Sequence, residues 1–320
     1  MWACCQMQRV NKEYAELDTA WIQGEIASGR DSLVEAGWID DREYQVNTHK
    51  IKYQILNTHQ KSRTKNFRDV EAHATPEELK QLDLSGYLLK ERMFQSEHLD
   101  QLREAVDKLF EAEVDLEKRE TRERSWGPIL RYLEDKDPVF LELIRYQPIL
   151  SIAKAMMGPI LRLRGLSSRI SFPGEEIQSA PYHQHLRVNQ IPRPPWFSDP
   201  HSLDALIYLD DLNEDAGLVY LVPGSHAWQD REPPYRQYDP LDDEVSFAIP
   251  AGSVVLMHGN LWHRTGPTVG TRRRMLILSY TPSWLCRSPH GTKPEDGLTD
   301  AALKNADQEL RELLGVEGKT

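Results

Sequence analysis

The stretch PYHQH at residues 181–185 decides the fold that the sequence predicts. Alternate side chains of a β-strand point to the same face, so His183 and His185 would project together into one cavity. His263 lies on a later predicted strand that would close this cavity, and Arg274 follows on the next strand, where its guanidinium suits a carboxylate. Three imidazoles with an anion clamp beside them are typical of a metal site inside a jelly-roll barrel.

Short apolar strands separated by glycine and proline turns surround this stretch, a pattern that predicts a sandwich or barrel. Apolar residues at helical spacing predict helices that flank the strands. The expected strands cover residues 160–164, 204–210, 218–222, 246–249, 253–257 and 275–280, and the expected helices cover residues 96–112, 138–145, 148–157 and 300–314. We therefore expect a mainly β protein with flanking helices and a double-stranded β-helix (jelly-roll, cupin-like) core.

Changes in polarity and in the expected helices and strands divide the chain into three parts. Residues 1–80 are expected to form a helical or irregular N-terminal extension, through which a homo-oligomer would form. Residues 81–288 are expected to form the double-stranded β-helix domain, and residues 289–320 a C-terminal tail with one helix. Near the first boundary, Thr75 and Glu78 fit a capping box with a proline between them, which predicts that a helix starts there.

The composition excludes several classes of partner. The chain has 320 residues, of which 28% are charged and 39% hydrophobic, as in soluble globular proteins. Its net charge of −11 argues against nucleic acid and against anionic membrane surfaces as main partners. No apolar run is long enough to span a membrane, and no signal-peptide pattern is visible. The three cysteines are too few for a disulfide framework, so we expect a cytoplasmic protein.

From residue 85 to residue 284 the chain resembles the phytanoyl-CoA dioxygenase family of Fe(II)/2-oxoglutarate oxygenases. The resemblance rests on several motifs that occur in the family's order. These are residues 85–89, 181–185, 205–211, 217–226, 250–253 and 258–259, followed by His263 and Arg274.

This resemblance implies an oxygenase whose iron is bound by His183, His185 and His263. It also implies 2-oxoglutarate as co-substrate, held at its far carboxylate by Arg274 with support from Thr265, and O2 as the second co-substrate. The implied reaction is oxidation of a small molecule, hydroxylation by default, with release of succinate and CO2. Related enzymes also desaturate, epimerise, cyclise or halogenate, and no motif of this chain identifies its substrate.

The first metal motif departs from the family pattern at a ligand. The family has His-x-Asp, whereas this chain has His183 and His185. Exchanging a carboxylate for a neutral imidazole raises the net charge of the site by one. Three outcomes stay open: His185 binds iron directly, swings aside to leave an open position, or leaves the site poor in metal. Glu175 and Glu176 lie upstream, but their spacing does not match the motif and favours turn residues.

The loop at residues 186–200 is the expected specificity element. Arg187 and Arg193 would face an acidic or polar small-molecule substrate, and Trp196 would form a wall of its pocket. The alternative is a rigid surface loop stiffened by its prolines.

Two rival functions follow from the missing carboxylate. One is a three-histidine iron dioxygenase that does not use 2-oxoglutarate and binds its substrate at the metal. The other is a catalytically inactive barrel that serves as a binding or partner subunit. Arg274 argues against both, because a buried cation there needs an anion to hold.

Overall fold

A computed structural model describes residues 48–55, 66–114, 127–174, 179–185, 200–228, 230–285 and 295–316 of the chain. All described residues belong to one compact unit, residues 46–320.

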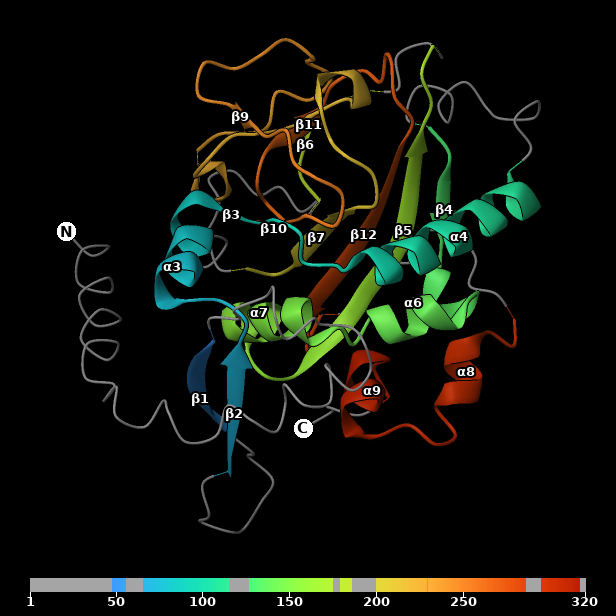
Figure 1. Cartoon of the computed structure of the whole chain (residues 1–320). Coiled ribbons are helices and arrows are strands. Elements are labelled where there is room, and N and C mark those ends of the chain that lie inside the picture. Colours follow the sequence, from blue (N-terminus) through green and yellow to red (C-terminus); the bar gives the residue numbers. More distant parts are fainter. Residues whose placement is uncertain are drawn as a thin grey trace, which may run out of the picture. The chain divides into compact units, whose positions relative to one another are not determined.

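Two antiparallel sheets form the centre of the fold (Figure 1). The larger sheet contains, in spatial order, β3 (Tyr87–Lys90), β10 (Val254–His258), β7 (Leu203–Tyr208), β12 (Arg273–Pro282), β5 (Leu161–Ser171) and β4 (Ile129–Arg131). The smaller sheet contains β6 (Ala180–His183), β11 (His263–Thr265), β8 (Val219–Leu221) and β9 (Val245–Ser246). The predicted mainly β, jelly-roll architecture is therefore confirmed.

The core between the sheets comes from alternate residues of their strands. Leu206 and Met275 of the larger sheet pack with Val219 and Leu221 of the smaller one in a single apolar cluster. Because side chains alternate along a strand, the neighbours of these residues point away from the barrel interior. The larger sheet therefore has an inner face toward β8 and an outer face that another layer must cover.

Helices supply this outer layer (Figure 1). They are α3 (Pro76–Ser85), α4 (Ser96–Glu113), α6 (Pro138–Leu143) and α7 (Gln147–Met157). Tyr280 of β12 is fully buried on this side, and its hydroxyl donates to the carbonyl of Ile144, between α6 and α7, at 2.9 Å. The capping box is confirmed, since the Thr75 hydroxyl accepts from the backbone N–H of Glu78 at 3.2 Å. Both faces of the larger sheet are thus buried.

Two terminal segments differ from the predictions. The described part of the N-terminal extension includes an antiparallel hairpin, β1 (His49–Ile55) and β2 (Asn66–Ala72), where helical or irregular structure was expected. The tail contains two short helices, α8 (Leu298–Ala302) and α9 (Gln308–Leu313), instead of one. The break occurs because the Asp307 carboxylate accepts from the N–H of Leu310 at 2.9 Å and so starts a new helix.

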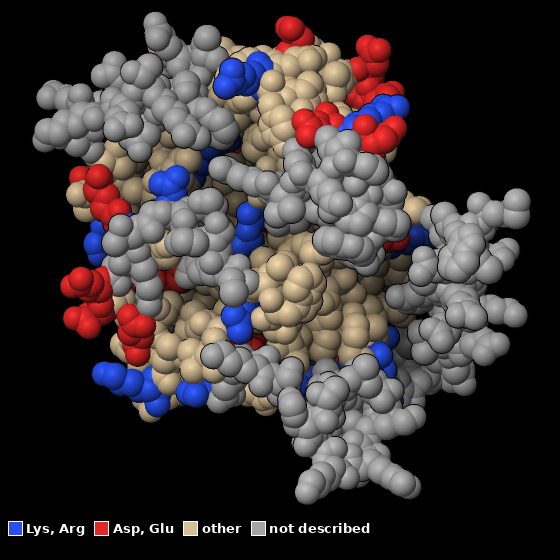
Figure 2. All heavy atoms as spheres, turned by 180° about the vertical axis from the view of Figure 1, so that it is seen from behind, with Lys and Arg blue, Asp and Glu red and all other residues tan. Residues whose placement is uncertain are grey.

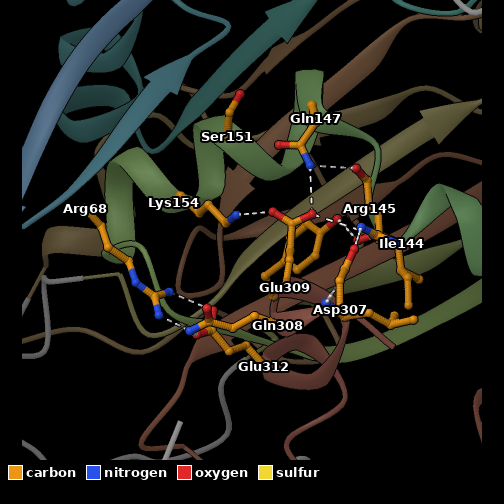
Figure 3. A network of polar contacts seen from close by, with 12 residues as sticks. Arg68, Ile144, Arg145, Gln147, Ser151, Lys154, Asp307, Gln308, Glu309 and Glu312 are labelled. Carbon is orange, nitrogen blue, oxygen red and sulfur yellow. Dashed lines mark hydrogen bonds and ion pairs between the residues drawn. The ribbon is translucent and has the colours of Figure 1, made fainter. Parts of the chain in front are cut away.

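Acidic side chains of α9 attach the tail to the hairpin and to α7 (Figure 3). Glu312 forms a two-bond fork with the guanidinium of Arg68 on β2, at 2.7 and 2.9 Å. Glu309 pairs with Lys154 and accepts from the amide of Gln147 at 3.0 Å. These contacts join segments that are far apart in the sequence.

Charge is unevenly spread over the surface. On the face seen in Figure 2, basic side chains lie in and around a central hollow, while most acidic ones lie toward the edges. Within the described ranges, no helix has the length and apolar character needed to cross a bilayer.

Candidate metal centre

Three histidines converge at one end of the smaller sheet. His183 ends β6, His185 follows two residues later, and His263 begins β11, where it is paired with His183 in the ladder. The Nε2 atoms of His185 and His263 are 3.1 Å apart, and the ring centroids of His183 and His263 are 4.1 Å apart. One nitrogen from each ring lies within 4.8 Å of the other two. The structure therefore brings together all three predicted ligands.

Backbone carbonyls orient two of these rings. Nδ1 of His183 lies 2.8 Å from the carbonyl oxygen of Pro181, and Nδ1 of His263 lies 2.9 Å from that of Leu261. A ring that donates its Nδ1–H to a carbonyl keeps the Nε2 lone pair for a metal. Burial, followed by the nearby rings of His183 and His185, holds the pKa of His263 well below its ordinary value. His263 is therefore neutral, as a metal ligand must be.

The third ring is oriented by a carboxylate. Nδ1 of His185 lies 2.9 Å from Oδ2 of Asp204, a fully buried residue of β7. Asp204 also accepts from the hydroxyls of Ser202, at 3.3 Å, and Ser279. Burial alone would raise the pKa of the Asp204 carboxyl, but His185, Arg164 and Ser279 outweigh it and hold the pKa well below its ordinary value. The carboxylate is thus ionised beside the ring.

This donor set fits a first-row divalent metal. Imidazole nitrogen is a borderline donor that suits iron, cobalt, nickel, copper and zinc. Three such nitrogens on one side leave further coordination positions for other ligands. All three ligand side chains belong to the barrel, and their second ring nitrogens are already engaged, which is the arrangement expected at a preformed metal site.

The prediction that Arg274 clamps an anion inside the barrel is wrong. Its Nε lies 2.9 Å from Oδ2 of Asp210, and its NH1 lies 2.8 Å from Oδ2 of Asp107 on α4. Hydrogen bonds to Asp210 are the main cause that raises the pKa of Arg274. The guanidinium is thus neutralised by carboxylates of the chain. Arg274 does share a face of β12 with Tyr280, as alternation predicts, but that face lies under the helices and not inside the barrel.

Arg273, one residue earlier, points into the barrel and is fully buried. It donates to the carbonyl of Gly217 and to the hydroxyl of Ser171, the latter at 3.1 Å. Its Nε has no hydrogen-bond partner among the described residues. Burial lowers the pKa of Arg273 below its ordinary value, because a charged guanidinium is destabilised when it is removed from water.

A second arginine lies beside it. Arg169 of β5 is buried, and burial followed by the charge of Arg273 lowers its pKa to about 9. NH1 of Arg169 donates to the hydroxyl of Thr265 at 3.1 Å, so the structure places predicted Thr265 next to this pair. Tyr208 pairs across β12 from Arg169, through Met275, and its buried hydroxyl has no partner among the described residues. Arg273, Arg169, Tyr208 and Thr265 thus form a buried cationic cluster, in which the Nε of Arg273 and the hydroxyl of Tyr208 have no partner among the described residues.

Sequence reasoning missed Arg273, Arg169, Tyr208 and Asp204. A lone aspartate inside an apolar strand gave a signal for Asp204, whereas Arg169 does not follow the alternation of Arg162 and Arg164 and carried no such signal. The predicted substrate-binding residues Arg187, Arg193 and Trp196 lie outside the described ranges, as do Glu175 and Glu176.

Residues 82–276 match the family described as Phytanoyl-CoA dioxygenase (PhyH). Among curated proteins, the chain is 27% identical over 185 residues to Dioxygenase af480 from Aspergillus fumigatus, covering 55% of this chain and 57% of that protein. It is 26% identical over 159 residues to a probable alpha-ketoglutarate-dependent hypophosphite dioxygenase from Stutzerimonas stutzeri, covering 43% of this chain and 51% of that protein. The chain therefore spans about half the length of these two relatives.

Solved structures share the fold. HygX from Streptomyces hygroscopicus, crystallised with nickel and 2-oxoglutarate, superposes with a TM-score of 0.53 at 17% identity, over 68% of this chain and 90% of its own. The carbocyclase SnoK from nogalamycin biosynthesis gives a TM-score of 0.52 at 20% identity, over 73% of this chain and 91% of its own. At these identities the likeness establishes the architecture alone.

Proposed function

Because the chain belongs to the phytanoyl-CoA dioxygenase family, we propose that it is a non-haem iron oxygenase that consumes 2-oxoglutarate and O2. The observation that carries the proposal is the presence, in one barrel, of three convergent imidazoles and a buried cluster of two arginines. The imidazoles would bind a metal, and an anion would stabilise the two buried cations. The names of the curated relatives, which are dioxygenases, support the same class.

His183, His185 and His263 would hold the iron through Nε2. Iron bound there would supply the activation of O2 that is coupled to oxidative decarboxylation of 2-oxoglutarate. The protein's own task is to orient the three rings so that Nε2 of each faces the metal. It does so through the carbonyls of Pro181 and Leu261 and the carboxylate of Asp204.

Arg273 and Arg169 would bind the far carboxylate of 2-oxoglutarate. A planar guanidinium matches a carboxylate with two parallel hydrogen bonds, and a second buried cation increases the attraction. The unused Nε of Arg273 and the hydroxyl of Tyr208 would each gain an acceptor when an anion enters. Thr265 would hold Arg169 in place through the bond to its hydroxyl. An anion bound at this cationic cluster would thus reduce the cost of burying two cations next to each other.

The organic substrate would be a small molecule that enters beside the metal. Hydroxylation is the default outcome, with succinate and CO2 as co-products. We assign the substrate contacts to Arg187, Arg193 and Trp196, which follow the metal motif directly in the sequence. Two cations near an acidic or polar group of the substrate would fix its orientation.

A turnover assay tests this function without knowledge of the substrate. The protein is loaded with Fe(II) and exposed to air with 2-oxoglutarate labelled at its first carbon; the labelled CO2 is counted, and the unlabelled succinate is quantified separately by chromatography. We expect equal amounts of both, and loss of both in His263→Gln, whereas Arg274→Ala retains them. Iron binding without succinate would favour the three-histidine dioxygenase that does not use 2-oxoglutarate. A folded protein that binds no iron would favour the inactive binding barrel.

A further inference from the structure

We propose that Asp204 is a positioning residue of the metal centre that acts through His185. Its carboxylate fixes the imidazole with Nε2 toward the metal. It also places a carboxylate directly behind the one imidazole that stands where the family pattern has a carboxylate ligand. The inference rests on the proposed function only in taking the three-histidine cluster as a metal site.

The position of Asp204 is unusual for a carboxylate. It lies within β7, the central strand between β10 and β12, and its side chain is fully buried. An ionised carboxylate in such a place destabilises the fold unless it is paired and hydrogen-bonded. Here the surrounding groups are Nδ1 of His185 at 2.9 Å, two serine hydroxyls, and the guanidinium of Arg164 at 3.6 Å. The groups around Asp204 are therefore donors and a cation, which fix its carboxylate in position beside His185.

His185 differs from the other two ligands in the kind of acceptor that it uses. His183 and His263 place Nδ1 on backbone carbonyls, whereas His185 places Nδ1 on a carboxylate. A carboxylate acceptor makes an imidazole a stronger electron donor than a carbonyl does. His185 is also the ligand that stands where the family pattern has aspartate. The ligand that replaces the family's aspartate is therefore the same histidine that contacts the carboxylate of Asp204.

His185 is held from its backbone as well. Arg164 donates from NH2 to the carbonyl of His185 at 2.8 Å, while its NH1 faces Asp204. Arg164 thus fixes the main chain of His185, and Asp204 fixes its ring. This arrangement favours a His185 that stays at the metal over one that swings aside to leave an open position.

Metal affinity measured without 2-oxoglutarate tests the proposal. Apo-protein is titrated with Co(II), whose visible absorption reports binding to imidazole. We expect Asp204→Asn to weaken Co(II) binding by about 10- to 100-fold, the usual effect of removing the partner of a metal-bound histidine. The matched control is Asp210→Asn, which removes a carboxylate from the outer face of the same sheet and should change the affinity less than about threefold. Unchanged affinity in Asp204→Asn would overturn the proposal.

A double-mutant cycle shows whether Asp204 acts through the ring. In a His185→Ala background, Asp204→Asn should weaken Co(II) binding less than about twofold, because the connecting imidazole is gone. An equally large effect in both backgrounds would mean that Asp204 acts on the metal directly, and would overturn the proposal.

A second measurement needs no change at Asp204. The wild-type protein is labelled with ¹⁵N-histidine and loaded with Zn(II), and the ring nitrogens are assigned by NMR. The proposal predicts a metal on Nε2 and a strongly deshielded proton on Nδ1 of His185. Binding of His185 through Nδ1, or no binding by this ring, would overturn it. If both tests succeed but no succinate forms in the turnover assay, only the proposed function fails.

Discussion

Arg273 and Arg274 are consecutive residues of β12, yet their guanidinium groups lie on opposite faces of the larger sheet. Arg274 points outward and is paired with Asp210 and Asp107. Arg273 points into the barrel, where its Nε has no partner among the described residues. A one-residue step therefore separates a cation that stabilises the fold from a cation that is available to a ligand.

The buried cationic cluster of Arg169 and Arg273 predicts that a bound anion stabilises the fold, and that this gain depends on Arg169. Its pKa is lowered to about 9 by burial and by Arg273, so a bound dicarboxylate relieves their repulsion. 2-Oxoglutarate at a hundred times its Kd should raise the free energy of unfolding of the Co(II)-loaded protein by about 2.7 kcal/mol. Arg169→Met should lose most of this gain at the same ligand concentration, as measured by thermal unfolding.

The control for this prediction is Arg131→Met, which changes an exposed arginine on the neighbouring strand β4. It should retain the full stabilisation. A full gain in Arg169→Met as well would show that the anion binds elsewhere.

His98 should make the protein sensitive to acid. It lies in α4 beside the stacked rings of Phe94 and Tyr146, and burial lowers its pKa from 6.5 to about 4. As the pH falls below 6.5, His98 binds a proton in the unfolded chain but stays neutral in the folded protein until about pH 4. The free energy of unfolding therefore decreases progressively between pH 6.5 and pH 4. Between pH 6.5 and 4.5 this loss is about 2–3 kcal/mol.

Urea unfolding of the wild type and of His98→Phe at pH 7 and pH 4.5 measures this contribution. The variant should lose less stability on acidification, by about 2–3 kcal/mol. His73, whose pKa burial also lowers to about 4, remains in both proteins and keeps part of the acid sensitivity. Equal losses in the two proteins would show that His98 does not titrate in the folded state as described.

The fork between Arg68 and Glu312 should hold the C-terminal tail on the β1–β2 hairpin. Glu312 is buried, so replacing its charge by an amide weakens two charge-assisted hydrogen bonds. Glu312→Gln should lower the free energy of unfolding by about 1–3 kcal/mol in urea denaturation. Asp100→Asn, which breaks an ion pair whose carboxylate is 71% exposed, should cost less than about 1 kcal/mol. Equal effects of the two changes would contradict the structural role of the fork.

The sequence alone predicted the features that depend on particular residue types at a fixed spacing along the chain. The capping residues Thr75 and Glu78 and the three clustered histidines follow such rules, and the structure places them as predicted. The hairpin carried a signal too, because Ile51, Tyr53 and Ile55 alternate with polar residues as in a strand.

Other features depend on contacts that no local pattern contains. Alternation along β12 separates two faces, but it cannot say which one lies inside the barrel, because helices bury the other face equally well. For that reason the sequence predicts Arg274, and not Arg273, as the anion clamp. Asp204 is only an isolated acid in an apolar strand until the fold brings His185 to it.

The most direct test of the central claim is an anaerobic titration with Fe(II), with and without 2-oxoglutarate, that records the visible metal-to-ligand charge-transfer band. A band should appear only when both are present. Arg273→Ala should raise the 2-oxoglutarate concentration required by about 30-fold or more, while Arg274→Ala leaves it within about threefold of the wild type. Iron binding without a band, or equal losses in the two variants, would contradict a 2-oxoglutarate site built on Arg273.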